Sequence, residues 1–576
     1  KNYHNDTLIS LYQGYEEICK TQNLVDFGEL LLLTFETLRN SETLLAKYHE
    51  RFRHLLIDEF QDTNEIQYLW IRLLSNTKNF VMAVGDDDQS IYSWRGARIE
   101  NIQRFTKDFK DVFEVRLEQN YRSTETILKA ANSLISNNTG RLGKNLWTDC
   151  GERGPIELYT AFNEQDEARF VSASAKRLNE QNRNYKEMAV LYRSNSQSRV
   201  LEEALLREKI PYRIYGGQRF YERLEIKNAL MYLRLISNKQ DDTAFERVVN
   251  MPPRGIGDKT MGLLRETARD EGLSLWDSVS FLLNYGCLLS SRATSALASF
   301  KKMLECLSDL SLKLPLSDLT SRVIVETKLI EYHRAEKGER GQTRVENLEE
   351  LISAIDSYVP EDDNTPALIQ FLNQASLDAG ERQADIDDDA VQLMTLHSAK
   401  GLEFPEVFLV GVEEDLFPHK MSLDSVSGIE EERRLAYVGM TRAMKKLTLT
   451  HAERRKIFGE EKVCRLSRFV KQEIPSDLIQ EIRIESSNVR SQGSIKYGAQ
   501  PIKWAQLNKE KEAIEQQLDA IVETLYIGQR VEHKVFGEGT ILEFKGTGAK
   551  QKASILFDDE GIKVLFLIYA NLIPLG

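Results

Sequence analysis

The sequence of 576 residues predicts an α/β protein with an inserted helical domain and a small β module at its C-terminal end. Three observations predict this class. Short apolar runs alternate with helical stretches in two parts of the chain, residues 216–388 have almost purely helical periodicity, and residues 526–576 alternate apolar and polar positions around glycine-rich turns. The length exceeds what one hydrophobic core supports, so several domains are expected.

The elements follow in order along the chain. Residues 1–52 are predicted to be helical, because Leu, Ile and Tyr recur three and four positions apart. Short apolar runs of the kind that forms buried parallel strands then begin at His54, Val81, Val112 and Ala189, and later at Val391, Glu406 and Leu447. Polar residues follow these runs, at the strand ends where α/β sheets bind ligands.

Changes in composition and in hydrophobic periodicity along the chain predict domain boundaries. We expect the end of a helical subdomain at 1–52, part of a first α/β domain at 53–118, a second α/β domain at 119–215 and 389–485, a helical insert at 216–388, a linker and helix at 486–525, and the β module at 526–576. The helix within 486–525 would present Leu507, Ile514, Leu518, Ile521 and Leu525 on one face.

The bulk properties exclude several classes of protein. The net charge of −13 argues against a surface coated with basic residues, although it leaves room for a local basic groove. Five scattered cysteines without a C-x-x-C pair indicate neither a zinc site nor a disulfide framework, and they fit a reducing cytoplasm. No apolar run reaches membrane-spanning length, so no membrane partner is expected.

Five polar motifs follow the predicted strands and helices. In order, they are Leu55–Asp62 (LLIDEFQD), Val84–Ala97 (VGDDDQSIYSWRGA), Gln119–Thr124 (QNYRST), Thr395–Phe404 (TLHSAKGLEF) and Glu431–Ala443 (EERRLAYVGMTRA). The series resembles motifs II to VI of superfamily 1 DNA helicases of the UvrD/PcrA/Rep family. The resemblance runs nearly end to end, and Gly140–Trp147 with the β module places it nearest the UvrD type within that family.

This resemblance implies two RecA-like motor domains, the first of them incomplete, with ATP and Mg²⁺ between them and a Tudor-like β-barrel at the C-terminus. By resemblance, Asp58 holds Mg²⁺ through water and Glu59 accepts the proton of the attacking water. The other implied ATP-site residues are Gln89 and the clamping pair Arg122 and Arg442 at the γ-phosphate, Tyr121 on the adenine and Glu403 on the ribose. Read alone, each is equally typical of a surface ion pair or a packed ring.

Tyr92, Trp94 and Arg95 interleave rings with a cation, a pattern that suits single-stranded DNA. Arg193, Asn195 and His397 match further strand contacts of the family, whereas a tryptophan read alone is as often a core residue. Gly255, Ile256 and Gly257 resemble a duplex-gripping hairpin, and a plain helix-connecting turn is the alternative.

Phe458 resembles the tip of a hairpin that wedges between base pairs, with Arg454, Arg455 and Lys456 holding the DNA backbone. The alternative is that Phe458 packs against the second motor domain and stabilises it.

The sequence departs from the family in one respect. No G-x-x-x-x-G-K-[ST] loop occurs, and Gly546–Lys550 has the wrong spacing for one. We therefore expect a missing N-terminal segment of roughly 100–200 residues. We also expect residues 1–576 alone to show no DNA-stimulated ATPase.

The resemblance implies an ATP-driven 3′→5′ DNA helicase of nucleotide excision and mismatch repair. The alternatives are a Rep-type replication-restart helicase and a non-catalytic remnant that binds DNA or a partner. A helicase–nuclease is disfavoured because no nuclease domain follows Glu431–Ala443. The implied partners are single-stranded DNA and its junctions with duplex, RNA polymerase, repair proteins and a second copy of the chain.

Overall fold

The computed structural model describes residues 3–482 except 153, 286–288, 337–338, 361–364, 381–383, 385–387 and 458, and also describes 528–533, 537–545, 552–558, 561–566 and 573–574. The chain divides into two compact units, Lys1–Ile484 and Glu485–Gly576, and each is treated by itself. The expected linker and helix at 486–525 lie outside the described residues. In the part of the chain that the structure describes, no helix is both long and apolar enough to cross a membrane.

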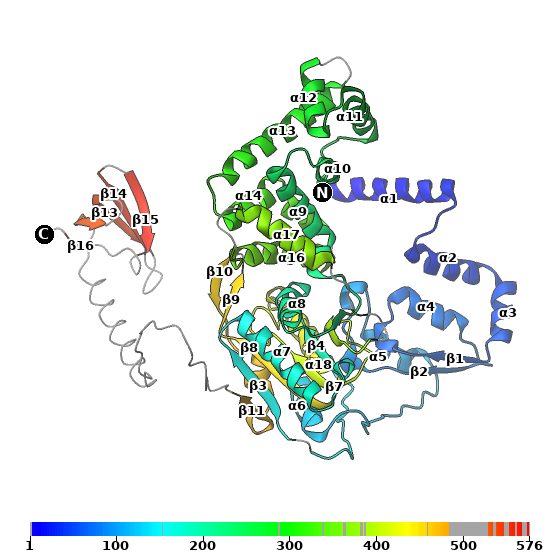
Figure 1. The fold of residues 1–576 in the computed structure, drawn as a ribbon. Coiled ribbons are helices and arrows are strands. Elements are labelled where there is room, and N and C mark those ends of the chain that lie inside the picture. The colour runs from blue at the N-terminus through cyan, green and yellow to red at the C-terminus, as the bar shows by residue number, and fades with distance from the viewer. Residues whose placement is uncertain are drawn as a thin grey trace. The chain divides into compact units, whose positions relative to one another are not determined.

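The first part of the chain is helical, as predicted (Figure 1). It forms α1 (Tyr3–Gln22), α2 (Phe27–Asn40) and α3 (Glu42–Arg51). Asp26 begins α2 by accepting a hydrogen bond from the Glu29 amide at 2.7 Å. A parallel β1–α4–β2 unit follows, with β1 at His54–Ile57, α4 at Glu65–Leu74 and β2 at Phe80–Ala83, and α5 (Glu100–Asp108) completes this segment.

One predicted strand is wrong. Residues Val112–Leu117 form no strand, and Phe113 is 88% exposed. The apolar run satisfies the local criterion for a strand, but a strand also needs a neighbour for its backbone groups. Among the described residues, no strand pairs with this run.

The second α/β domain contains a parallel sheet of seven strands in the order β11-β3-β8-β7-β4-β6-β5. The strands are β3 (Ile156–Ala161), β4 (Met188–Tyr192), β5 (Tyr212–Ile214), β6 (Val391–Thr395), β7 (Phe404–Leu409), β8 (Ala443–Ala452) and β11 (Ile479–Ile482). Its helices are α6 (Glu125–Ile135), α7 (Glu164–Glu180), α8 (Ser198–Arg207), α18 (Val426–Met440) and α19 (Arg468–Glu473). Strands from before and after residues 216–388 share one sheet, so the helices between them interrupt a single sheet.

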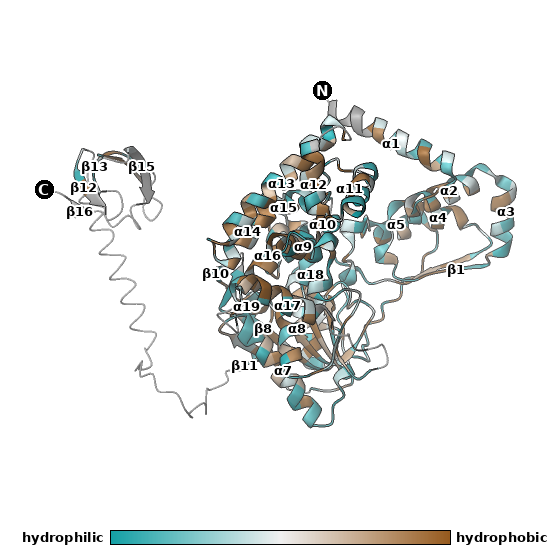
Figure 2. Ribbon diagram, turned by 45° about the horizontal axis from the view of Figure 1, so that its top comes forward, coloured by the Kyte–Doolittle hydropathy of each residue, from teal (hydrophilic) through white to brown (hydrophobic). Residues whose placement is uncertain are grey.

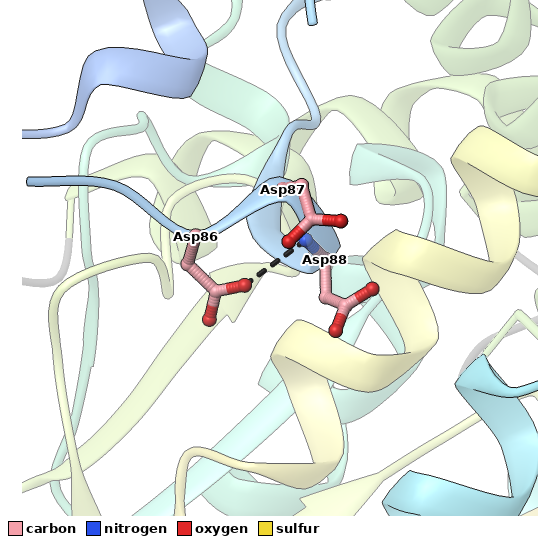
Figure 3. A group of neighbouring side chains, drawn as sticks. All are labelled: Asp86, Asp87 and Asp88. Carbon is pink, nitrogen blue, oxygen red and sulfur yellow. Dashed lines mark hydrogen bonds between the residues drawn. The ribbon is translucent and has the colours of Figure 1, made fainter. Parts of the chain in front are cut away.

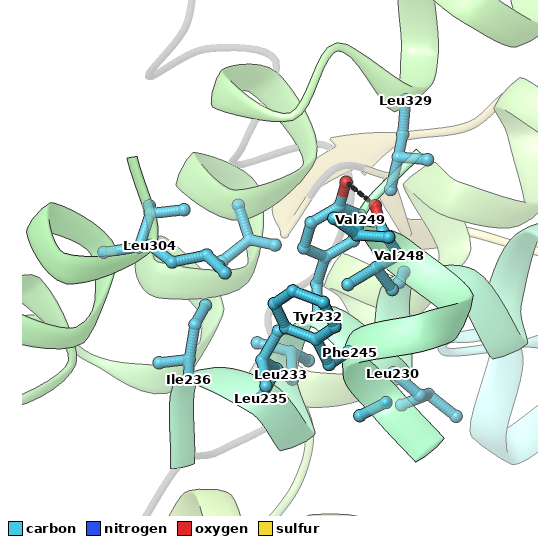
Figure 4. Packing of buried hydrophobic residues seen from close by; sticks show 14 of the residues in the cluster. Leu230, Tyr232, Leu233, Leu235, Ile236, Phe245, Val248, Val249, Leu304 and Leu329 are labelled. Carbon is cyan, nitrogen blue, oxygen red and sulfur yellow. Dashed lines mark hydrogen bonds between the residues drawn. The ribbon is translucent and has the colours of Figure 1, made fainter. Parts of the chain in front are cut away.

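The insert is helical, as predicted. Its helices are α9 (Leu224–Ser237), α10 (Asp242–Val248), α11 (Asp258–Glu271), α12 (Leu275–Tyr285), α13 (Ser291–Ser311), α14 (Leu316–Glu326), α15 (Leu329–Arg334), α16 (Glu339–Asp356) and α17 (Ala367–Gly380). Several of them carry hydrophobic stretches (Figure 2), and these pack into one core. Tyr232 lies within that core and its hydroxyl donates to the Val248 carbonyl at 3.0 Å (Figure 4).

Two smaller β structures complete the chain. An antiparallel hairpin of β9 (Arg454–Ile457) and β10 (Glu460–Val463) follows β8, as the resemblance implied. In the second unit, an antiparallel sheet contains β12 (Arg530–His533), β13 (Gly537–Lys545), β14 (Lys552–Phe557), β15 (Gly561–Phe566) and β16 (Ile573–Pro574). The predicted β module is thereby confirmed.

Candidate functional site

The two carboxylates predicted to act together lie directly after β1. Glu59 adopts a left-handed conformation with φ of 49°, which is uncommon for a residue other than glycine and concentrates at functional sites. Its amide donates to Oδ1 of Asp58 at 2.9 Å, and its Oε2 accepts from the Gln61 amide group at 2.5 Å. Both acids therefore have a fixed orientation at the end of the strand.

The loop after β2 is locked to the loop after β1. The Phe60 amide donates to the Val84 carbonyl at 2.9 Å, and the Asp86 amide donates to Oε1 of Gln61 at 2.9 Å. A Cβ at Gly85 would lie 2.7 Å from the same Gln61 oxygen, so a larger residue there would have to displace the Gln61 side chain. This close approach fixes Gln89 relative to Glu59.

Lys400 joins the site from the loop after β6. Its Nζ lies 3.1 Å from Oε2 of Glu59 and 2.5 Å from Oδ2 of Asp62, and it donates to the Gln89 carbonyl at 3.0 Å. Burial raises the pKa of Asp62, and the charge of Lys400 opposes that rise. Lys400 had no role in our prediction, although it lies inside the motif Thr395–Phe404.

Gln89 and Arg442 come together, as the resemblance implied. Arg442 is 2% exposed, and its Nη2 donates to Oε1 of Gln89 at 3.3 Å. It also donates to the carbonyls of Val438 at 3.0 Å and Leu402 at 3.1 Å and to the Thr441 hydroxyl at 3.3 Å. Burial, with the nearby charge of Arg122, lowers the pKa of Arg442 to about 10. An anion such as a phosphate would relieve both effects.

The remaining predicted ATP-site residues lie at the second α/β domain. Nε of Arg122 donates to Oε2 of Glu403 at 2.6 Å, so two residues predicted to contact ATP pair with each other. The Tyr121 ring is 79% exposed, and its hydroxyl donates to Gln119 at 2.9 Å. An exposed ring next to the partly exposed Arg122 is compatible with stacking on a base.

Asp86, Asp87 and Asp88 bring three carboxylates close together (Figure 3), which raises the question of a metal. Protein groups already occupy them. Arg141 donates to both oxygens of Asp88 at 2.7 and 2.6 Å, Lys144 pairs with Asp86, and the Leu142 amide donates to Asp87 at 2.8 Å. The three acids therefore bind the segment 140–144, and we assign no metal to them.

Three rings form a cluster beside this loop. The centroids of Tyr92 and Trp94 are 6.3 Å apart, and each lies 6.5 Å from that of His397. Cζ of Arg95 lies 4.6 Å from the centroid of Trp94. Trp94 is 47% exposed, so its ring is available at the surface rather than enclosed in a core. Four predicted DNA-binding residues thus lie together.

Arg193 and Asn195 follow β4. Arg193 is paired with Glu432 of α18 at 2.8 Å, so a contact with DNA would have to share or open this ion pair. The Asn195 carbonyl accepts from Arg223 at 2.9 Å. The structure thus places both residues in protein contacts, and their role at DNA stays a prediction.

The predicted duplex-gripping turn offers backbone rather than side chains. Ile256 is 1% exposed and packs in the core of the insert. Gly255 has φ of 81° and lies against the Arg292 guanidinium, and Gly257 is the residue before α11. Only the peptide groups of this turn could contact a phosphate.

The hairpin corrects one expectation. Phe458 lies outside the described residues, but Arg455 was expected to follow DNA and instead pairs with Glu413 at 2.7 Å and with Glu167. That expectation is wrong, because burying two carboxylates requires a buried cation between them. Lys456 pairs with Asp356 of α16, and the Gly459 amide donates to Ser353 at 3.3 Å.

Comparisons with known proteins agree with this arrangement. Residues 1–110 match the family described as UvrD/REP helicase N-terminal domain, residues 115–454 match UvrD-like helicase C-terminal domain, and residues 527–573 match PcrA/UvrD tudor domain.

Relatives cover almost the whole chain. DNA helicase II of Escherichia coli (strain K12) is 52% identical over 98% of this chain, and the matched region is 76% of that protein. DNA helicase II of Haemophilus influenzae is 49% identical over 98% of the chain and 75% of that protein. ATP-dependent DNA helicase PcrA of Bacillus subtilis (strain 168) is 38% identical over 99% of the chain and 77% of that protein. The chain therefore belongs to the UvrD-like helicase family.

Proposed function

We propose that this chain is the greater part of an ATP-driven motor that moves along single-stranded DNA and separates duplex. One observation carries the proposal. The loop of residues 85–95 contributes to two clusters: its Gln89 contacts Lys400 and Arg442, and Lys400 also pairs with Glu59. Its Tyr92 and Trp94 form the ring cluster with His397. A change at a bound phosphate would therefore reach the DNA through a few residues.

Each residue of the candidate ATP site would have a separate role in hydrolysis. Bound ATP would supply the reacting phosphoryl group, and Asp58 would hold its Mg²⁺ through water. Glu59 would accept the proton of the attacking water, while Lys400 holds its carboxylate. Gln89, Arg122 and Arg442 would meet the charge that develops on the γ-phosphate. Tyr121 and Glu403 would contact the nucleoside.

The Glu59 assignment has a direct test in the full-length protein. Glu59→Gln should lower turnover by about 10²-fold or more, the scale of a lost general base, while ATP binding is retained. Turnover near the parent rate would remove Glu59 from the reaction.

The ring cluster supports binding without sequence preference, because every base can stack on an aromatic face. Trp94→Ala should weaken single-stranded DNA binding by about 1–3 kcal/mol and leave the dependence on salt concentration unchanged. Unchanged affinity in a folded variant would make Trp94 a packing residue only.

The finer assignments rest on family membership. We propose 3′→5′ polarity, a role in nucleotide excision and mismatch repair, a cytoplasmic location, Phe458 as the wedge at the junction with duplex, and the predicted domain boundaries. RNA polymerase, repair proteins and a second copy of the chain are the proposed partners. A wedge variant, Phe458→Ala, should keep DNA-stimulated ATPase and lose unwinding. Parallel decline of both activities with stability would favour packing instead.

The alternative of a non-catalytic remnant is opposed by the intact cluster around Arg442. A Rep-type restart helicase remains the nearest alternative function. Complementation of a strain lacking its DNA helicase II, compared with one lacking its restart helicase, would separate the two.

A further inference from the structure

The helix α18 and the residues that follow it contact the loop 89–95 at three places. Oε1 of Glu431 accepts from the Ser93 amide at 3.2 Å, and its Oε2 accepts from the Ser93 hydroxyl. One turn later, Nε of Arg434 donates to the Ser90 carbonyl at 2.8 Å. Just beyond the helix, Arg442 donates to Gln89 at 3.3 Å. The order of contacts along the loop is the reverse of the order along the helix.

This arrangement makes α18 a rigid link between two sites. Glu431 and Arg434 are three positions apart and so lie on one face of the helix, and Arg442 follows directly after its C-cap, Thr441. One end of the link therefore meets the ring cluster and the other end meets the arginine pair.

Glu431 acts on the backbone that carries the rings. Ser93 begins a short 3₁₀ helix, Ser93–Arg95, whose first amide has no partner within the helix. A single carboxylate accepts from both donors of Ser93, so it fixes the direction in which the chain enters Trp94. Hydrogen bonds to an ionised acceptor are stronger and more directional than neutral ones.

The neighbouring acids have other partners, which makes the contact of Glu431 specific. Glu430 accepts from the Thr139 amide at 2.8 Å and from its hydroxyl at 2.7 Å, and Glu432 pairs with Arg193. Three consecutive carboxylates on one helix thus contact three different parts of the chain. Of these acids, it is Glu431 that forms hydrogen bonds to the loop that carries Trp94.

We infer that Glu431 is a positioning residue that couples the nucleotide state to the grip on single-stranded DNA, through Ser93 and the ring of Trp94. The inference rests on the proposed function, because it needs the arginine pair to bind the γ-phosphate and the rings to bind DNA. Removing the carboxylate would leave both sites in place and weaken the dependence of one on the other.

The test measures affinity for fluorescent oligo(dT) by anisotropy, in ADP and in a non-hydrolysable ATP analogue, with the full-length protein. The ratio of the two dissociation constants reports the coupling. Glu431→Ala and Ser93→Ala should each reduce this ratio by about tenfold, within the range usual for coupled sites. The double variant should show no further loss beyond Glu431→Ala, because that change already removes both hydrogen bonds to Ser93. Glu430→Gln is the matched control and should leave the ratio unchanged.

Two results would overturn the inference. One is a parental ratio in both Glu431→Ala and Ser93→Ala. The other is an equal loss in Glu430→Gln, which would indicate a general effect on the helix. If Glu431→Ala does not fold, Ser93→Ala decides, because it removes one hydroxyl only. Failure of the proposed function is distinguishable, because Trp94→Ala would then bind DNA as the parent does in both nucleotides.

Discussion

Replacing Arg455 by Met should loosen the base of the β9–β10 hairpin, because its guanidinium lies between two buried carboxylates. Glu413 and Glu167 are 0% and 4% exposed, and both pair with this one cation. They also accept hydrogen bonds from the Ala452 amide at 2.6 Å and the Gly411 amide at 2.9 Å. The variant would keep both acids in place without a counter-charge.

The magnitude follows from this burial. Removing one partner of a buried ion pair costs about 3–5 kcal/mol. At about 1.4 kcal/mol per factor of ten, amides of β8 and β9 should exchange with solvent about 10²–10⁴ times faster. Arg454→Met is the matched control, because Arg454 pairs with Glu461 at the surface and such a pair is worth about 1 kcal/mol or less.

The dependence on pH gives a second signature. Burial would raise the pKa of Glu413, but the charge and hydrogen bonds of Arg455 hold it below its ordinary value. In the parent, the contribution of Glu413 to stability is present above about pH 4.5 and is lost as pH falls further. Without Arg455 the pKa should rise, so the variant should recover stability as pH falls towards 5.

The measurement is native-state hydrogen exchange at pH 5 and pH 8. Exchange in Arg455→Met no faster than in Arg454→Met would refute the reasoning. So would a variant whose deficit is the same at both pH values.

Other predictions concern separate parts of the molecule. Arg442→Ala in the full-length protein should lower ATP turnover by about 10³-fold while ADP affinity barely changes, measured by steady-state kinetics and calorimetry; turnover near the parent's would remove it from the site. Burial and the nearby Glu346 raise the pKa of Glu349 from 4.5 to about 7, so the folded state holds more protons in that window and stability should fall as pH rises through it. Glu349→Gln should flatten this slope in thermal melts, and an unchanged slope would contradict the assignment. Gly85→Ala should impair turnover, because a Cβ 2.7 Å from Oε1 of Gln61 would displace the side chain that bonds Glu59 and the Asp86 amide; parental turnover would show that Gln61 can shift without effect.

Sequence reasoning located the strands that end at functional loops because their apolar runs are local signals. The strand predicted at Val112–Leu117 was wrong, because an apolar run is a local signal and says nothing about whether a neighbouring strand is present. Strands β3, β5 and β11 were not singled out, although they complete the sheet.

In the candidate site, too, contacts within the family motifs were predictable and contacts between distant residues were not. Gln89 and Arg442 meet as the family resemblance implied, because a motif keeps its residues in a common geometry. Pairing partners distant in sequence were not predictable. Nothing near Arg455 indicates that it would pair with Glu167, and nothing near Lys400 indicates that it would reach Glu59. In the sequence, a charged residue that faces a ligand cannot be told apart from one that pairs with another side chain.

The interrupted sheet has a consequence for synthesis on the ribosome. Strands β3, β4 and β5 precede the insert, and none of them pairs with another. The neighbours of β4 are β6 and β7, so its last residue, Tyr192, emerges 199 residues before Val391 begins its first partner (391 minus 192). At about 5–20 residues per second, that interval is roughly 10–40 s. During this time a five-residue apolar strand has both edges open, the condition in which nascent chains aggregate or need a chaperone.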